Sequence, residues 1–358
     1  MHQRNISKAI LKLCFLSLIL GFGASFADDI SSELEASIIQ SIEDGLFPGL
    51  IIGITDDQGS RYYGYGQITL GDGVTPDKDT VYEIGSVSKT FTATLLASMV
   101  QEGLVSLHDP VQSLLPDSVK IPQYNGQQIT LAHLSTHRSS LPRMPGNFTP
   151  TNPLNPYADY SVQNMYEFLS SYKLTREIAE RSEYSNLAVG LLGHALAGKA
   201  GSSYENLLNI RLLNPLSMDS TAITFSDSML QRLATPYAYQ NDLLTAVQNW
   251  DAPALAGAGA IRSTAQDMLK FLATQLGQTN STLTAAMKLT QQPQTYYGDK
   301  DDRIGLGWFI STEGEHSYHW HDGGTGGYTS FAAFSVEENR AVVLLTNSTR
   351  SLNGIGVN

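Results

Sequence analysis

Segments with the pattern of β-strands lie towards both ends of this 358-residue chain, and a long helical stretch separates them. The strand-like segments are 50–54, 61–68, 305–311, 317–321, 328–334 and 341–346. Between residues 90 and 290, apolar side chains instead recur at the spacing of helices. We therefore expect an α+β fold, in which an antiparallel sheet is flanked by helices and carries an inserted, mostly helical subdomain. A cleft between the two parts is the natural place for a site.

Amphipathic periodicity predicts the individual helices, and one segment between them lacks it. Helices are expected at 30–42, 90–100, 129–135, 162–172, 187–198, 204–213 and 264–276. Residues 141–160 contain five prolines, which cannot continue a helix or a central strand. We expect this segment to run over the surface as an irregular loop.

Residues 1–27 have the pattern of a secretory signal peptide. Arg4, Lys8 and Lys12 form a basic start, a nearly all-apolar stretch follows, and small residues precede position 28. We expect an exported chain, periplasmic or secreted, without a stable membrane anchor. Cys14, the one cysteine, lies in this segment, so the exported chain would use no disulfide or thiol. Residues 28–358 would form a single catalytic domain, its sheet part at about 28–85 and 303–358 and its helical part at about 86–302.

The charge balance excludes some classes of partner. Residues 28–358 carry 19 Lys and Arg against 34 Asp and Glu, a net charge of −15. Such a chain repels nucleic acid and anionic lipid, and no basic cluster offsets this. We expect a monomer that acts on a small molecule.

The segment 83–92 joins a short extended run to a helical run and contains the strongest candidate site. Ser86 would lie at the first helical turn, where free N–H groups and the helix dipole favour negative charge. Lys89, three residues later, rises on the same face. A hydroxyl beside an amine that can take its proton makes an activated nucleophile. The alternative is a helix-capping serine, and the same spacing recurs at Ser170 and Lys173.

Tyr184 and Asn186 lie at the entry to the helix predicted at 187–198. A tyrosine two residues before an asparagine occurs twice elsewhere in the chain, but only here at a loop-to-helix entry. A phenol acts as a base only where neighbouring cations lower its pKa, which Lys89 could do. The alternative is a buried tyrosine with a satisfied hydroxyl.

Residues 321–327, His-Asp-Gly-Gly-Thr-Gly-Gly, follow a predicted strand. Glycines weaken a strand unless its backbone must approach a ligand closely. A bare strand edge could hydrogen-bond an extended amide substrate. One of its N–H groups could form an oxyanion hole with that of Ser86. His319 and His321 share one strand face, and His133 and His137 are spaced i, i+4 on a helix. No carboxylate completes either pair, so we predict no metal site.

Three motifs, taken in order, resemble those of the serine β-lactamase and penicillin-binding peptidase superfamily. They are Ser86-Val87-Ser88-Lys89, Tyr184-Ser185-Asn186 and His321-Asp322-Gly323. The tyrosine in the second motif resembles the class C branch, which includes D-alanyl-D-alanine carboxypeptidase/endopeptidases of the AmpH type and several esterases. The resemblance extends over nearly all of residues 30–347, with supporting blocks at 134–142, 257–268 and 305–308.

The resemblance implies a role for each motif residue. Ser86 would be the acylated nucleophile, Lys89 its proton acceptor and Tyr184 the general base. Asn186 would hold the substrate amide and the lysine. His321 and Gly323, in the third motif, would be further substrate-binding residues. The N–H groups of Ser86 and Gly324 would form the oxyanion hole. No metal or cofactor is implied, and the partner would be a β-lactam or a peptidoglycan-derived peptide.

The third motif departs from the family pattern at two positions. His321 replaces the usual lysine and is expected to be partly charged near neutral pH. Asp322 replaces a threonine and could repel a substrate carboxylate. Both changes leave open a carboxylesterase of the same fold, and a non-catalytic penicillin-binding homologue is the other alternative.

Overall fold

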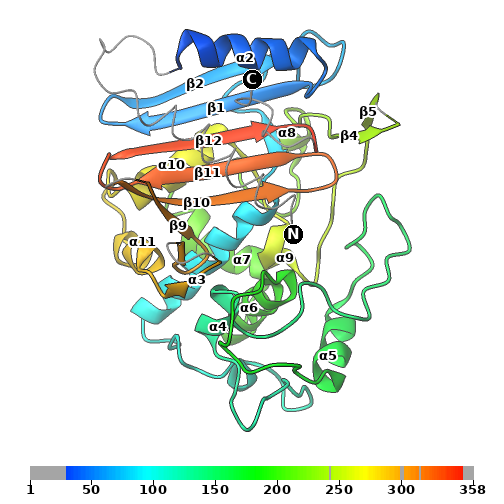
Figure 1. Ribbon diagram of the computed structural model, residues 1–358, viewed down its shortest axis with the longest axis vertical. Coiled ribbons are helices and arrows are strands. Elements are labelled where there is room, and N and C mark those ends of the chain that lie inside the picture. The colour runs from blue at the N-terminus through cyan, green and yellow to red at the C-terminus, as the bar shows by residue number, and fades with distance from the viewer. Residues whose placement is uncertain (1–29, 242, 299–301, 314–315, 350–358) are drawn as a thin grey trace.

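The computed structural model describes residues 30–241, 243–298, 302–313 and 316–349, which form an α+β fold. Its main sheet is antiparallel, with the strand order β2-β1-β12-β11-β10-β9-β8-β7 (Figure 1). The bounds are β1 (Gly49–Asp56), β2 (Gly59–Gly66), β7 (Thr295–Tyr296), β8 (Arg303–Ile304), β9 (Phe309–Glu313), β10 (His316–Gly324), β11 (Thr329–Ser335) and β12 (Arg340–Thr346). The sheet thus joins strands from both ends of the described chain.

Both faces of the sheet are covered, which explains why its inner strands β1 and β12 are apolar at most positions. Along β1, Ile51 packs into the core shared with the helical part, whereas Ile52 packs into a second core on the opposite face. The second core also contains Ile38 from helix α2 (Ser32–Glu43), which lies against β2 (Figure 1). Ser31 caps α2 by accepting a hydrogen bond from the N–H of Leu34.

The helical part lies below the sheet in Figure 1 and is crossed by two buried helices. Helix α3 (Ser88–Gln101) is buried from Ser88 to Met99, and α6 (Asn186–Lys199) is buried over most of its length. The other helices are α4 (Leu131–Ser135), α5 (Val162–Ser171), α7 (Tyr204–Leu208), α8 (Asp227–Leu230), α9 (Ala256–Gly259), α10 (Ala265–Gln275) and α11 (Thr284–Gln291). Helix α9 contacts both α3 and α6, so its small residues bring three helices together.

A short ladder outside the main sheet fixes the start of α3. Strand β3 (Val81–Glu83) pairs antiparallel with β6 (Arg262–Thr264), placing Glu83 opposite Arg262. These two side chains are each 3% exposed and form an ion pair of 3.5 Å. The carboxylate of Glu83 also accepts a hydrogen bond from the N–H of Trp250. Buried charge that is paired in this way holds the turn after β3 in one position.

Several sequence predictions need correction. The strand predicted at 305–311 is interrupted: Gly307 has a left-handed φ of +73°, and β8 and β9 lie on either side. The strand predicted at 317–321 continues through the glycines to Gly324. The hairpin of β4 (Tyr237–Gln240) and β5 (Leu243–Ala246), and helix α11, were not predicted. The other predicted helices and the irregular course of 141–160 agree with the structure.

The predicted signal segment, residues 1–27, lies outside the described residues. Within the described part of the chain, every helix is too short or too polar to cross a membrane.

Candidate active site

Ser86 lies in η1 (Gly85–Val87), a single 3-10 turn between β3 and α3. Gly85 has a φ of +48°, a left-handed value that glycine adopts without steric cost. A Cβ atom on Gly85 would lie 2.6 Å from the backbone nitrogen of Gly324, so strand β10 closely approaches this turn. Ser86 is partly exposed between buried neighbours. Its hydroxyl is therefore accessible at the start of a buried helix, as the sequence predicts.

Lys89 lies one turn into α3, where its side chain is buried. Its Nζ atom is 2.9 Å from Oγ of Ser86 and donates a hydrogen bond of 2.6 Å to the carbonyl oxygen of Ala258. Burial lowers the pKa of Lys89 well below its usual value, and the nearby Arg143 guanidinium lowers it further. A neutral amine beside a hydroxyl can accept the hydroxyl proton.

Tyr184 ends the loop before α6 and faces the same two residues. Nζ of Lys89 lies 4.8 Å from the centre of its ring. Burial raises the pKa of Tyr184 well above its usual value, and a hydrogen bond with Ser86 opposes this only in part. The expectation that Lys89 lowers this pKa is therefore wrong, because loss of water outweighs the nearby cations. The side chain is a neutral phenol in the free enzyme.

The position of Tyr184 is fixed by its neighbours in the loop at 137–143. The ring of His137 packs against the tyrosine ring with centroids 4.4 Å apart. Nδ1 of His137 accepts a hydrogen bond of 3.2 Å from the N–H of Ser185. Ser185 in turn caps α6, accepting a hydrogen bond from the N–H of Ala188. His137, which the sequence suggested as half of a rejected metal pair and within the block 134–142, thus aligns the second motif.

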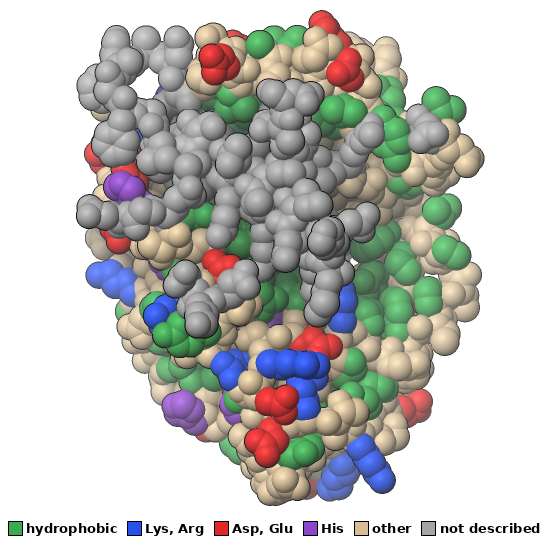
Figure 2. All heavy atoms as spheres, in the orientation of Figure 1, with side chains coloured by type: hydrophobic (Ala, Val, Ile, Leu, Met, Phe, Trp, Pro, Cys, Tyr) green, Lys and Arg blue, Asp and Glu red, His purple; other side chains and the backbone are tan. Residues whose placement is uncertain are grey.

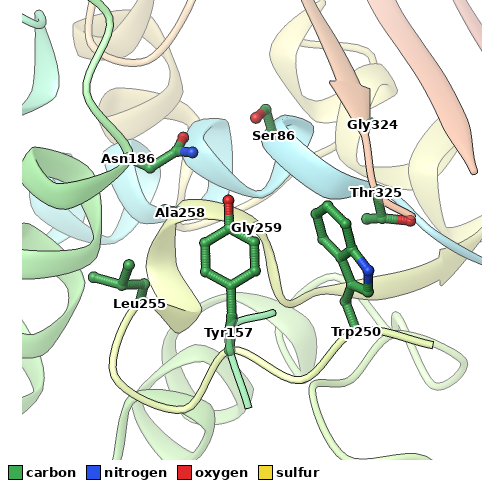
Figure 3. Close-up of a pocket in the computed structure, with 10 residues that line it drawn as sticks. Ser86, Tyr157, Asn186, Trp250, Leu255, Ala258, Gly259, Gly324 and Thr325 are labelled. Atoms are coloured by element: carbon green, nitrogen blue, oxygen red, sulfur yellow. The ribbon is translucent and has the colours of Figure 1, made fainter. Parts of the chain in front are cut away.

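Asn186 is the first residue of α6 and lines the cleft. Its backbone N–H donates a hydrogen bond of 3.0 Å to the carbonyl of Arg143, and its amide lies next to the Tyr157 hydroxyl (Figure 3). Its Oδ1 is buried and, within the described residues, has no hydrogen-bond partner. The expected contact between Asn186 and Lys89 is not formed among these residues, because Lys89 bonds to Ser86 and Ala258 instead. The buried Oδ1 remains available to a ligand N–H.

The third motif lies at the end of β10, beside Ser86. A Cβ atom at Gly323 would overlap the carbonyl oxygen of Ile84 and the hydroxyl of Ser330, so only glycine fits there. At Gly324 the Cβ position is open, with one atom, the Tyr328 oxygen, at 3.8 Å. The strand can therefore lie against η1, and the backbone of Gly324 lines the pocket with Ser86.

His321 is fully buried, and its state differs from the expectation. Burial lowers its pKa to about 3, and the nearby Lys89 contributes to the shift. The expectation of a partly charged side chain near neutral pH is therefore wrong. Nδ1 lies 2.6 Å from the carbonyl oxygen of Asp322; because a carbonyl only accepts, Nδ1 carries the proton and Nε2 a lone pair. Nε2 is buried and has no partner among the described residues.

The pocket in front of Ser86 encloses about 410 Å³ between protein atoms, some of it open to solvent. Tyr157 and Trp250 pack together, with ring centroids 5.2 Å apart, and form one wall that Leu255 extends (Figure 3). The polar groups converge at one end, where Ser86, Asn186 and Gly324 lie. The arrangement suits an apolar group attached to an amide or ester that reaches Ser86.

Sequence reasoning did not identify Tyr157, Trp250 or Arg143 as site residues. Tyr157 lies in the proline-rich loop. Trp250 lies in a segment without the apolar periodicity of a helix or strand, and its N–H is hydrogen-bonded to Glu83. Arg143 directly follows the block 134–142, and this adjacency was the one available signal.

The described residues contain no group of three or more His, Cys, Asp or Glu side chains placed to hold a metal ion. His133 instead completes a capping box with Thr130 at the start of α4. Nε2 of His319 lies 3.0 Å from the carbonyl oxygen of Gln291.

The sequence and fold match those of known proteins. The model of the Beta-lactamase family matches residues 34–354, so the chain belongs to that family, within the serine β-lactamase and penicillin-binding peptidase superfamily. The D-alanyl-D-alanine-carboxypeptidase/endopeptidase AmpH of Escherichia coli (strain K12) is 29% identical over 341 residues, 88% of this chain and 85% of AmpH. A Beta-lactamase of the same strain is 26% identical over 374 residues, 94% of this chain and 93% of that protein.

Solved structures show the same fold. A Beta-lactamase/D-alanine carboxypeptidase from Yersinia pestis, complexed with citrate, has a TM-score of 0.78 at 25% identity, covering 91% of this chain and 97% of that one. A class C beta lactamase from Rhodobacter sphaeroides has a TM-score of 0.76 at 24% identity, covering 90% and 96%. The predicted superfamily, fold class and serine hydrolase type are confirmed.

Proposed function

We propose that this chain is an exported serine hydrolase that forms an acyl-enzyme at Ser86 and acts on β-lactams or D-alanyl-D-alanine peptides. The observation that carries the proposal is the 2.9 Å contact between Oγ of Ser86 and the buried Nζ of Lys89. The activities named for AmpH and for the related beta-lactamase support the substrate class. The pattern of residues 1–27 supports export.

In the acylation step, Oγ of Ser86 would attack the carbonyl carbon of the substrate amide while its proton passes to the neutral amine of Lys89. The negative charge that develops on the carbonyl oxygen would be held by the N–H groups of Ser86 and Gly324. The start of α3 adds its positive end to this charge. Donors that are fixed in the folded backbone before reaction would need little reorganisation.

Tyr184 would act in the second half of acylation. Its hydroxyl, neutral and hydrogen-bonded to Ser86, can donate a proton to the departing nitrogen and recover one from the ammonium of Lys89. The amide C–N bond then breaks and the acyl group remains on Ser86. In deacylation, water would attack the acyl carbon and give its proton to Tyr184, while the phenol proton passes to Lys89. The ammonium of Lys89 would then return a proton to Oγ of Ser86 as the acyl C–O bond breaks.

Asn186 and the pocket would orient the acyl group. The buried, unpartnered Oδ1 of Asn186 can accept a hydrogen bond from the N–H of a peptide or penicillin side chain. Tyr157 and Trp250 would then hold the apolar portion beyond that amide. Burial of the apolar portion fixes the carbonyl near Ser86, which raises the rate through positioning.

A carboxylesterase of the same fold is the second candidate, and the state of His321 favours it. A neutral side chain in the third motif offers no charge to a substrate carboxylate, so small neutral esters lose nothing at this position. A non-catalytic penicillin-binding homologue would instead bind without turnover.

One comparison separates these candidates. Purified protein and its Ser86→Ala variant are assayed with nitrocefin, a D-alanyl-D-alanine peptide and p-nitrophenyl butyrate. We expect turnover of nitrocefin or the peptide that Ser86→Ala abolishes. An ester rate higher than both others by orders of magnitude would replace the proposal with the esterase. Absence of turnover with all three substrates would replace it with the non-catalytic binding homologue.

A further inference from the structure

Substrates of the proposed class carry a carboxylate on the departing side of the scissile bond, and two expected sources of positive charge are missing. His321 presents a lone pair at Nε2, which repels a carboxylate instead of binding it. Lys89 is buried, and its lowered pKa favours the neutral amine. The exposed Asp322 adds negative charge beside the motif. A carboxylate therefore requires a cation from elsewhere in the site.

Arg143 is placed to supply that charge. Its guanidinium carbon lies 4.9 Å from the ring centre of Tyr184, the ring that Nζ of Lys89 also approaches. Its backbone carbonyl accepts hydrogen bonds from the N–H groups of Asn186 and Leu187, at 3.0 and 3.2 Å. The backbone of Arg143 is thereby tied to the start of α6, while its side chain is exposed.

Other arginines form ion pairs, whereas Arg143 forms none with a described residue. Arg176 and Arg181 both approach the carboxylate of Glu183, at 2.9 and 3.9 Å. Arg262 is buried and paired with Glu83. Within the described ranges, no carboxylate forms an ion pair with Arg143, although acidic side chains lie among the basic ones on the helical half of one face (Figure 2). Among the described residues, none accepts a hydrogen bond from the Arg143 guanidinium, whose five N–H donors can bind a ligand.

We propose that Arg143 binds the carboxylate on the leaving group of the substrate and so selects carboxylate-bearing acyl donors. The inference deepens the proposed function and rests on it. A planar guanidinium can contact both carboxylate oxygens at once, which fixes the leaving group relative to Tyr184, its proton donor. Arg143 thus supplies, from the segment between α4 and α5, the charge that His321 does not provide on β10.

The simpler alternative is that Arg143 only covers the face of Tyr184. A cation over an aromatic ring stabilises both by itself, and loss of the arginine would then slow every substrate equally. A test must therefore measure a ratio between two substrates that share the same acyl group.

Two esters of N-(phenylacetyl)glycine provide that ratio. One has 3-hydroxybenzoate as its leaving group, and the other has the methyl ester of 3-hydroxybenzoate, which lacks the charge. The kcat/KM of each is measured for wild type, Arg143→Gln, Arg143→Lys and the control Arg181→Gln. Arg181 is an exposed arginine near Tyr184 in sequence that does not contact its ring, so its variant controls for net charge.

We expect wild type to prefer the charged ester and Arg143→Gln to lower that preference about tenfold, the effect of a lost charge-assisted hydrogen-bonded pair. Arg143→Lys should restore part of it, because ammonium keeps the charge without the fork. Arg181→Gln should keep the wild-type ratio. An unchanged ratio in Arg143→Gln, or an equal loss in Arg181→Gln, would overturn the proposal.

A binding measurement separates this inference from the proposed function. If wild type hydrolyses neither ester, the assay with nitrocefin and the D-alanyl-D-alanine peptide decides the proposed function, and the binding result decides the role of Arg143. Calorimetry with Ser86→Ala protein compares N-acetyl-D-alanyl-D-alanine with its C-terminal amide, with and without Arg143→Gln. Tighter binding of the free carboxylate that disappears in Arg143→Gln supports the proposal, and equal affinities contradict it.

Discussion

The carbonyl oxygen of Ala258 accepts a hydrogen bond of 2.6 Å from Nζ of Lys89. This bond comes from α9, whose small residues allow the helix to lie against α3. A Cβ atom on Gly257 would already lie 3.0 Å from Oγ1 of Thr92. The bond uses one N–H of the neutral amine and orients it so that its single lone pair can face the hydroxyl of Ser86. Helix α9 therefore contributes to the site through backbone alone.

The first prediction concerns the charge of Lys89. Because the proposed mechanism uses the neutral amine, kcat/KM for a neutral ester should rise with pH through the lowered pKa of Lys89 and then level off. Lys89→Arg should lose ~10²-fold or more, because a guanidinium keeps its proton. Stopped-time assays across the pH range provide both results. A Lys89→Arg variant with the wild-type rate and profile would assign proton transfer to another group.

The second prediction concerns Tyr184 and its coupling to Lys89. Tyr184→Phe removes the hydroxyl but keeps the ring that packs on His137, and should lower kcat by ~10²-fold. The double variant with Lys89→Ala should be little slower than the slower single variant, because the two groups act as a unit. Losses that multiply in the double variant would show that the groups act independently.

The sequence predicted the residues that local spacing determines. Ser86 and Lys89 lie on adjacent turns, and Tyr184 precedes a capped helix, so periodicity and junctions placed all three. Protonation states depend instead on burial by distant segments. The ring of His321 packs against Phe309 and near Tyr184, contacts that its own strand does not reveal.

The residues of the pocket walls could not be predicted from the sequence for a related reason. Tyr157 and Trp250 belong to loops, and a loop side chain is placed by whatever holds its backbone. For Trp250 this is Glu83, 167 residues away in sequence. Arg143 can be recognised as a site residue only when its guanidinium is known to lie over the ring of Tyr184. Single-sequence patterns contain no such long-range information.

The third prediction tests the neutral state of His321. With its pKa at about 3, this side chain does not change charge at neutral pH. We compare kcat/KM for a carboxylate-bearing ester with kcat/KM for its neutral match, because the titration of Lys89 affects both and cancels in their ratio. This ratio should stay constant between about pH 6 and pH 8. A ratio that increases towards pH 6 would show that His321 gains a proton near its usual pKa.

The fourth prediction compares two adjacent glycines of β10. Gly323→Ala forces a methyl group against the carbonyl of Ile84, where Ser330 donates a buried hydrogen bond of 2.8 Å. We expect the free energy of unfolding to fall by about 2 kcal/mol or more. Gly324→Ala, whose methyl group has open space, is the matched control and should unfold near the wild-type urea midpoint. Equal stability of the two variants would contradict the close contact between β10 and η1.

The central claim is that Ser86 becomes acylated, and mapping of the covalent adduct tests it most directly. Wild type and Ser86→Ala are incubated with a fluorescent penicillin and, separately, with a fluorophosphonate. Peptide mass spectrometry then locates the modification. The proposed mechanism predicts an adduct on the peptide containing Ser86 and Lys89, with its mass on Ser86, and no labelling of Ser86→Ala. An adduct on another residue, or equal labelling of the variant, would contradict it.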